Sequence, residues 1–270
     1  MSKTTTEDIV RRATAAFNSG QPDEARRLCE DGLTRQPGDP MLNHLLAAVL
    51  FSKGEIQSAR THVETSLAER PANGAAHFLA ARIARAAKDF DGALSHLDGA
   101  IAIAPQRELF LEKARTLDQA GLRLQAREAW RAILEVVPES LEAAARLGRL
   151  ALEDGDHASA VSLLERAAGG DAAASVWFDL GLARQDLRDY DGATTAYRKA
   201  LEIRSDYAEA ALNLGVVLQE AGDLDSAMRA YAEAYRLRPQ MFGTIAMALT
   251  SASHGRLWLD EAALRRSLGG

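Results

Sequence analysis

"VWFDLGLARQDLRDYDGATTAYRKALEI", from Val176 to Ile203, is the stretch that decides the fold of this chain. It holds two segments whose apolar residues recur at helical spacing, separated by a short polar turn. A second stretch, "AALNLGVVLQEAGDLDSAMRAYAEAYRLRP" from Ala210 to Pro239, follows the same pattern. Working outward from Ala193 and Ala227, the same alanine recurs toward the N-terminus at a nearly constant interval. A fixed period of this length indicates a repeat architecture.

The period is marked by an alanine that recurs every 33 or 34 residues and by a bulky residue four positions later. The alanines are Ala25, Ala59, Ala93, Ala126, Ala160, Ala193 and Ala227, which we call the anchor alanines. The bulky residues are Cys29, Val63, Leu97, Trp130, Leu164, Tyr197 and Tyr231. The spacing of four places the two residues on the same face of a helix, one turn apart. Each copy is therefore expected to bury this face against its neighbours.

Each copy is predicted to form two helices that are joined by a tight turn. A glycine stands five positions before the anchor alanine at Gly20, Gly54, Gly121, Gly155 and Gly222, where a helix end requires a positive φ. Two copies, "KDFDGALSHLDGAI" and "RDYDGATTAYRKAL", lack this glycine. Acidic residues just after several of these turns are expected to cap the second helix. Because a single hairpin cannot bury its apolar face alone, the hairpins must stack into a solenoid.

At this point the chain resembles the tetratricopeptide repeat (TPR) family, whose motif runs W-x2-L-G-x2-Y, then A-x3-F, then P. The matching residues of the best copy are Trp177, Leu180, Gly181, Ala193 and Tyr197, and those of the next copy are Leu214, Gly215, Ala227, Tyr231 and Pro239. The resemblance covers about residues 6–239. It implies an all-α fold, a right-handed α-α superhelical solenoid of about seven helix hairpins with a degenerate eighth hairpin as a C-terminal cap.

We expect residues 1–270 to form one TPR solenoid. The predicted repeats are about 6–39, 40–73, 74–106, 107–140, 141–173, 174–207 and 208–241, with 242–270 as the degenerate repeat or cap. In this last segment Asp260 stands where the anchor alanine is expected, so the turn is longer than in the other copies. Trp258 is predicted to fold over the open end of the core. The alternative is that Trp258 is a docking handle for a partner or for self-association.

Composition and charge exclude several classes of protein. The net charge of -6 and the pI of about 5.6 argue against a nucleic-acid-binding protein. A pentatricopeptide RNA-binding protein would show a period of 35 residues and basic charge, and neither is found. The chain contains no apolar run of membrane-spanning length and no apolar signal core at its N-terminus. With a single cysteine, Cys29, these features predict a cytoplasmic protein.

No catalytic or metal-binding pattern stands out. Asp154, Asp156 and Glu165 are spaced vaguely like a calcium loop, but the central glycine and the third ligand are missing. The histidines show no HxH or HxxxH spacing. Cys29 lies at a core position and is expected to be a small packed side chain. We therefore predict a protein that is not an enzyme, with no cofactor and no metal.

The resemblance implies that the first helix of each repeat lines a concave groove, where family members usually bind peptides. It places the following candidates for partner binding in this groove: Phe51, Phe78, Arg82, Arg85, Leu111, Arg115, Arg146, Arg149, Phe178 and Asn213. Arginine suits a bidentate grip on carboxylates, and the phenylalanines could hold apolar side chains. The groove is therefore a candidate site for an acidic peptide.

The alternative is that these arginines pair with acidic residues of the groove itself. Glu112, Asp118, Glu142 and Glu153 are the candidate partners, several of them at helical neighbour spacing. The family's well-known carboxylate clamp needs lysines and asparagines at positions that here hold other residues, including His44 and Ala48. A chaperone tail is therefore not the expected ligand.

The sequence predicts a non-enzymatic protein–protein interaction scaffold that binds a partner peptide in the groove. The alternative is a regulatory or substrate-presenting subunit of a separately encoded enzyme such as a glycosyltransferase or sulfotransferase. About thirty residues follow the last full repeat, too few for a catalytic domain of ordinary size. The expected partner is a protein or peptide, and the terminal repeats are candidates for self-association. No membrane or nucleic-acid partner is expected.

Overall fold

The computed structural model describes residues 5–169, 171–251 and 261–269. Within these ranges the chain forms sixteen α-helices, one short 3-10 helix and no strand. The helices follow one another in pairs: α1 (Thr6–Asn18) and α2 (Pro22–Leu33), α3 (Pro40–Ser52) and α4 (Ile56–Glu69), α5 (Gly74–Ala86) and α6 (Phe90–Ile103), α7 (Arg107–Gln119) and α8 (Arg123–Val136), α9 (Leu141–Glu153) and α10 (His157–Ala167), α11 (Ala174–Asp186) and α12 (Tyr190–Ile203), α13 (Ala208–Glu220) and α14 (Leu224–Leu237), α15 (Phe242–Ser251) and α16 (Glu261–Gly269). The 3-10 helix η1 (Pro239–Met241) precedes α15. The prediction of an all-α chain of stacked helix hairpins is confirmed.

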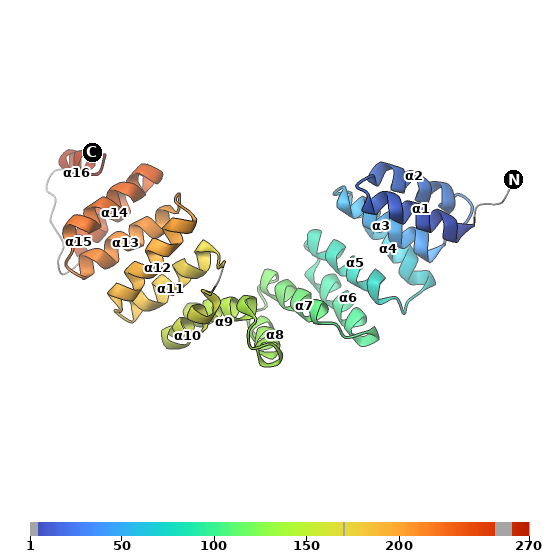
Figure 1. Cartoon of the computed structure of the whole chain (residues 1–270), viewed down its shortest axis with the longest axis horizontal. Coiled ribbons are helices and arrows are strands. Elements are labelled where there is room, and N and C mark those ends of the chain that lie inside the picture. Colours follow the sequence, from blue (N-terminus) through green and yellow to red (C-terminus); the bar gives the residue numbers. More distant parts are fainter. Residues whose placement is uncertain (1–4, 170, 252–260, 270) are drawn as a thin grey trace. The chain divides into compact units, whose positions relative to one another are not determined.

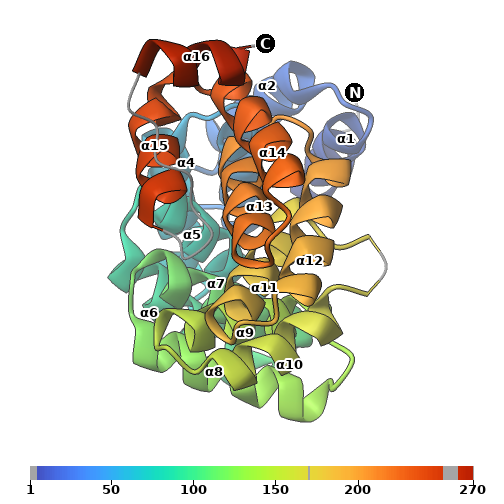
Figure 2. The same ribbon diagram turned by 90° about the vertical axis from the view of Figure 1, so that its left-hand side faces the viewer.

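The helices pack into two compact units, Met1–Ala129 and Trp130–Gly270, with the border inside α8. In unit 1, α2 packs on α3, α4 on α5 and α6 on α7, so that each hairpin rests on the next. In unit 2, α10 packs on α11 and α12 on α13 in the same manner (Figures 1 and 2). The prediction that residues 1–270 form a single solenoid stays a prediction.

The anchor alanines and the bulky residues that follow them form the centre of these stacks. All seven anchor alanines have 0% exposure. The bulky residues are almost as deeply buried, and Trp130, Tyr197 and Tyr231 are the largest fully buried side chains. Because alanine projects only a methyl group, the helix that carries it can approach its neighbour closely. The predicted core positions are confirmed.

The glycine of the Leu-Gly pair is required by the aromatic ring that faces it. A Cβ atom on Gly181 would lie 2.5 Å from Cε1 of Tyr197, and one on Gly215 would lie 2.5 Å from the ring of Tyr231. Both distances are far below van der Waals contact, so a larger residue would force the ring or the backbone to move. A tyrosine at the bulky position therefore requires a glycine at the facing position of the same hairpin.

The seven hairpin turns from α1–α2 to α13–α14 each contain a residue with positive φ, with or without glycine. The five predicted glycines have φ between 72° and 88°, which confirms the expected positive φ. Lys88 and Arg188, at the corresponding positions of the two copies without glycine, have φ of 62° and 59°. In the turn at Lys88, the N–H of the following residue, Asp89, donates to the carbonyl of Ala84 at 2.9 Å, which closes a Schellman motif. The stacking geometry therefore imposes the turn even where the side chain disfavours it.

Aspartates cap four of the second helices, as the acidic residues after the turns predicted. Asp89, Asp156, Asp189 and Asp223 each accept a hydrogen bond from the backbone N–H three residues later. These bonds contribute to lowering the pKa of Asp89, Asp156 and Asp223. Glu55 occupies the same position before α4 but makes no capping bond. Its carboxylate instead reaches the preceding hairpin.

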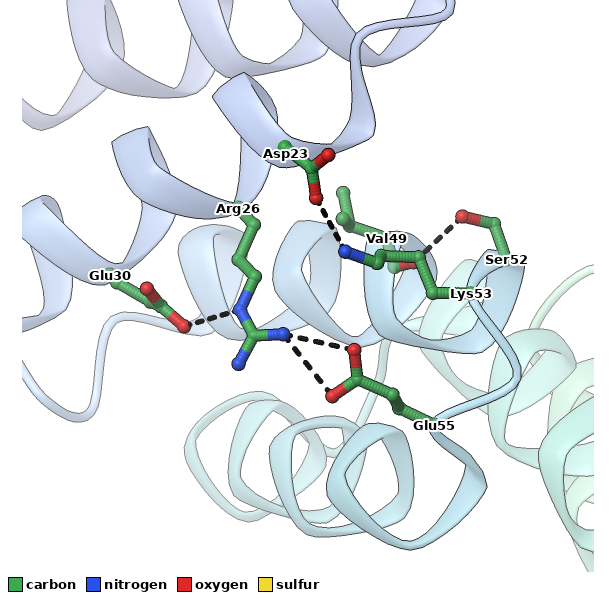
Figure 3. Close-up of polar contacts among 7 residues, drawn as sticks. All are labelled: Asp23, Arg26, Glu30, Val49, Ser52, Lys53 and Glu55. Carbon is green, nitrogen blue, oxygen red and sulfur yellow. Dashed lines mark hydrogen bonds and ion pairs between the residues drawn. The ribbon is translucent and has the colours of Figure 1, made fainter.

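An arginine one position after the anchor alanine links each of the first two hairpins to the next. Arg26 on α2 donates to Glu30 on its own helix at 2.7 Å and to Glu55, just before α4, at 2.9 Å (Figure 3). Thirty-four residues later, Arg60 on α4 pairs in the same way with Asp89, just before α6. We call Arg26 and Arg60 the arginine ladder. It joins second helices to the turns of their neighbours, and the sequence analysis did not predict it.

The C-terminal hairpin closes the core of unit 2. Ile245 and Leu249 of α15 and Leu264 and Leu268 of α16 are at most 3% exposed and share one apolar cluster with Tyr231. In Figure 1, α16 lies beside α14. These helices lie within the segment 242–270 that is predicted to be a degenerate repeat or cap, and this assignment stays a prediction. Trp258 lies outside the described residues, so its two interpretations stay predictions.

None of the helices in the described ranges is both long and apolar enough to cross a membrane.

Candidate functional site

The predicted groove residues lie on the first helices of hairpins in both units. Unit 1 carries Phe51 on α3, Phe78, Arg82 and Arg85 on α5, and Leu111 and Arg115 on α7. Unit 2 carries Arg146 and Arg149 on α9, Phe178 on α11 and Asn213 on α13. We call the unit 1 set, together with Glu112 of α7, the α3–α5–α7 face.

Arg82 is the exposed centre of the α3–α5–α7 face. Its guanidinium carbon lies 5.3 Å from the ring centroid of Phe51 and 6.0 Å from that of Phe78. Both rings are half-buried, and the Arg82 side chain is exposed. These distances are in the range of cation–π contacts, which orient the guanidinium without using its N–H donors. Within the part of the chain that the structure describes, Arg82 makes no ion pair.

The other two arginines of this face are held by one carboxylate. Arg85 Nη1 lies 2.6 Å from Oε2 of Glu112, and Arg115 Nη1 donates to Oε1 of the same residue at 2.8 Å. Glu112 is only 9% exposed, so this pairing is largely shielded from water. Arg115 also lies 3.5 Å from Glu108, a weaker contact. Glu112 therefore bridges α5 and α7 through two guanidinium groups.

Two further side chains of unit 1 limit what the face can offer. Leu111 is 8% exposed, so it presents little surface to a ligand. His44, two turns before Phe51 on α3, is half-buried, and this burial lowers its pKa. Its Nδ1 atom is buried and has no hydrogen-bond partner among the described residues. The face thus combines one exposed cation, Arg82, with two arginines that share a carboxylate and with partly exposed phenylalanine rings.

In unit 2 the predicted arginines lie near acidic residues. Arg149 donates to Glu153 at a long 3.4 Å, and its Nη1 atom lies 3.9 Å from Asp179 on α11. Asp179 is mostly buried, and this desolvation raises its pKa to about 6, although the nearby Arg149 opposes the shift. Arg146 is exposed on α9. The alternative in which groove arginines pair with groove acids therefore holds for Arg85, Arg115 and Arg149.

Phe178 belongs to an aromatic cluster that the sequence analysis did not predict. Its ring centroid lies 4.8 Å from that of Tyr207 and 5.8 Å from that of Tyr197. Arg204 stacks on the outer side chain of this cluster, 3.3 Å from the centroid of Tyr207. The hydroxyl of Tyr197 donates to Oε1 of Gln185 at 2.8 Å, and burial raises the pKa of Tyr197. Asn213 is half-buried on α13. The ring contacts occupy Phe178 within unit 2.

A register comparison could have found the buried acids. The residue fourteen positions before the anchor alanine is apolar in the second and third hairpins and polar in the later ones: Leu45, Leu79, Glu112, Arg146, Asp179 and Asn213. A carboxylate at a position that other repeats fill with leucine must be paired or have a shifted pKa. Glu112 is paired by two arginines, and Asp179 has a raised pKa. The arginine ladder was equally readable, from arginines 34 residues apart with acids in register.

Cys29 is not an activated nucleophile. This thiol is fully buried, and burial raises its pKa to about 12. A thiol of this kind stays protonated and unreactive at neutral pH. No group of three or more histidine, cysteine, aspartate or glutamate side chains that could hold a metal ion occurs in the described ranges.

Comparisons with known proteins agree with the fold. Three family models, each described as tetratricopeptide repeat, match residues 10–61 and 111–175, residues 50–115, and residues 171–240. Taken together, these matches run from residue 10 to residue 240. A comparison with curated proteins found no match.

Solved structures give the same result. A tetratricopeptide repeat protein from Parabacteroides merdae is 13% identical with a TM-score of 0.62, over 90% of this chain and 97% of that chain. The pilF protein of Pseudomonas aeruginosa is 16% identical with a TM-score of 0.62, over 76% of this chain and 94% of that chain. MamA from Desulfovibrio magneticus is 18% identical with a TM-score of 0.56, over 62% of this chain and 96% of that chain. At such low identity, these likenesses show the fold alone.

Proposed function

Because the chain belongs to the tetratricopeptide repeat family, we propose that it is a non-enzymatic scaffold that binds an acidic peptide segment of a partner protein. The binding site is the α3–α5–α7 face, with Arg82 at its centre. Stacked helix hairpins of this family are typical of protein-interaction scaffolds. The residues of unit 1 supply the chemistry that makes an acidic ligand the best fit.

The observation that supports this proposal is the state of Arg82. A guanidinium has five N–H donors, and Arg82 uses none of them on a carboxylate within the described residues. Phe51 and Phe78 contact the guanidinium by their rings, and Arg82 is exposed to solvent. A carboxylate can accept two parallel N–H bonds from such an edge. The ordering of the side chain is therefore achieved before a ligand arrives, which favours binding.

The same rings define what should stand beside the carboxylate. Phe51 and Phe78 are half-buried and keep part of their apolar surface exposed next to the charge. A leucine, methionine or aromatic residue one or two positions from the acidic residue of the peptide would cover that surface. A charged hydrogen bond contributes about 1.5–3 kcal/mol, and one apolar anchor contributes a similar amount. After the ordering of the peptide is subtracted, an affinity on the order of micromolar is expected.

The predicted residues of unit 2 are proposed as a separate contact surface, which need not meet the same peptide segment. Arg146 and Arg149 are exposed on α9. Phe178 and Asn213 are half-buried, so they are expected to shape the surface of unit 2 more than to bind directly. Charge reversal at Arg146 or Arg149 should therefore weaken binding less than charge reversal at Arg82.

The test is a selection of random 12-residue peptides displayed on phage against the full chain. We expect enriched peptides to carry aspartate or glutamate next to an apolar residue. Synthetic versions of these peptides should lose about tenfold to hundredfold in affinity for the Arg82→Glu variant, measured by fluorescence anisotropy. The loss should shrink at 0.5 M NaCl, because an exposed charge pair is screened by salt.

The matched control is Arg70→Glu. Arg70 is exposed at the end of α4, outside the α3–α5–α7 face, and its replacement changes the net charge by the same amount. This variant should bind the selected peptides like the unchanged protein. If selection enriches no acidic peptide, or if both variants lose affinity equally, the proposed function is wrong.

A further inference from the structure

Glu112 is the residue of the α3–α5–α7 face that contacts two arginines at once. One of its carboxylate oxygens lies 2.6 Å from Arg85 and the other accepts a hydrogen bond from Arg115 at 2.8 Å. The two arginines come from different helices, α5 and α7. Two guanidinium groups that converge on the two oxygens of one carboxylate form the arrangement in which proteins bind anionic ligands. Here the bound anion is a side chain of the protein itself.

This internal carboxylate is not easily displaced. Glu112 is 9% exposed and its side chain 12% exposed, whereas the side chains of Arg85 and Arg115 are 22% and 31% exposed. A ligand that took its place would leave the Glu112 charge buried without a partner, which is strongly unfavourable. Arg85 and Arg115 are therefore committed to Glu112 when a peptide arrives. Arg82, one helical turn before Arg85 on α5, is the cation of the face that no acid of the described residues holds.

We propose that Glu112 sets the anion selectivity of the α3–α5–α7 face, so that the face accepts a singly charged carboxylate and rejects a phosphorylated side chain. This inference rests on the proposed function, in which the face binds a peptide. It assigns to Glu112 a role in specificity without contact with the ligand's backbone or apolar anchor.

The selectivity follows from charge and from the number of available donors. A phosphorylated serine carries about −1.5 to −2 charges at neutral pH and three acceptor oxygens, and it is bound well where several arginines converge. Arg82 alone satisfies two acceptors, which matches a carboxylate. Glu112 cancels one of the two positive charges of Arg85 and Arg115, and the attraction that is lost in this way is larger for a dianion than for a monoanion. Removal of the Glu112 charge would restore this attraction and release the N–H donors that now bind Glu112, which favours the phosphate.

The experiment uses an array of matched synthetic peptides, identical within each set except for one residue that is glutamate, serine or phosphoserine between apolar neighbours. Binding of the labelled full chain is compared with that of Glu112→Gln. We expect the unchanged protein to bind the glutamate member of each set best. We expect Glu112→Gln to bind the phosphoserine peptide about ten times more tightly than the unchanged protein does. The phosphoserine member of each set then binds better than the glutamate member.

Glu108→Gln is the matched control. Glu108 lies on the same helix, but its contact with Arg115 is weaker, at 3.5 Å, and its side chain is 58% exposed. This variant should leave the order of the three peptides unchanged. The ranking by the unchanged protein is a test in its own right, so the inference stays falsifiable even if Glu112→Gln does not fold. Preference of the unchanged protein for phosphoserine, or an unaltered order in a folded Glu112→Gln, would overturn the inference while leaving peptide binding intact. If no peptide of any set binds, the proposed function fails and the inference fails with it.

Discussion

Replacing Lys88 by glycine should make the protein more stable. Lys88 holds φ at 62° in the turn between α5 and α6, a conformation that disfavours any residue with a Cβ atom. Its side chain is exposed and has no ion pair with a described residue. The Lys88→Gly change therefore removes a backbone penalty without removing a contact. Arg188, with φ of 59° in the turn between α11 and α12, offers the same test in unit 2.

The expected gain is a difference between two opposing contributions. The left-handed conformation costs a residue other than glycine about 1–2 kcal/mol in the folded state. Glycine in turn gains freedom in the unfolded chain, which lowers stability by about 0.4–1 kcal/mol. With the middle of each range, the net increase in the free energy of unfolding is about 0.8 kcal/mol for each replacement. In a chain of this size that corresponds to a rise in Tm of about 1–4 °C.

The measurement is urea unfolding followed by far-ultraviolet circular dichroism, with the midpoint compared at unchanged slope. Ala87→Gly is the matched control, since Ala87 is the neighbouring residue but has a right-handed conformation with φ of -77°. It should lower the stability by about 0.5–1 kcal/mol, because glycine there brings only the entropic penalty. If Lys88→Gly lowers the midpoint as Ala87→Gly does, the reasoning about this turn is wrong.

Three further predictions concern packing, surface charge and pH. Gly215→Ala should destabilise the protein by about 1–3 kcal/mol, because the added Cβ would lie 2.5 Å from the ring of Tyr231. Gly243→Ala is the control and should not destabilise the protein, because a Cβ there has no neighbour within 4 Å. Thermal unfolding measures the stability of both variants. Arg26→Ala should lower the free energy of unfolding by about 0.2–1 kcal/mol at low salt, because its two ion pairs are partly exposed, and an equal loss at 1 M NaCl would contradict an electrostatic origin. Burial lowers the pKa of His96, so the unfolded chain takes up a proton at a higher pH than the folded chain, and the free energy of unfolding falls as the pH drops below about 6.5. The decrease in the free energy of unfolding between pH 7.5 and pH 5.5 should therefore be smaller in His96→Gln. An identical decrease in both proteins would refute this assignment.

Much of the fold could be predicted because one short-range pattern repeats many times. Alanine and the bulky residue four positions later recur in register, and their burial follows directly from helical geometry. The turn at Lys88 was harder to predict, because its own residue argues against a positive φ. There the stacking of neighbouring hairpins outweighs local preference. The length of the turn, read from the register with the glycine-bearing copies, was the available signal.

The candidate site could be predicted only in part, because pairing between helices depends on their offset in space. The contact of Arg115 with Glu112 lies within one helix at a spacing of three and can be read from the sequence. The contact of Arg85 with Glu112 joins α5 to α7, and no spacing rule supplies it. No acidic residue of the described ranges pairs with Arg82, and this can be seen only in the structure.

The most direct test of the central claim is photo-crosslinking of a selected acidic peptide to the full chain. The apolar residue beside the peptide's carboxylate is replaced by benzoylphenylalanine, and the crosslinked positions are identified by mass spectrometry. Binding centred on Arg82 predicts crosslinks within α3, residues Pro40–Ser52, and α5, residues Gly74–Ala86. It also predicts that Arg82→Glu abolishes them. Crosslinks confined to the second helices α2, α4 and α6 would contradict the account.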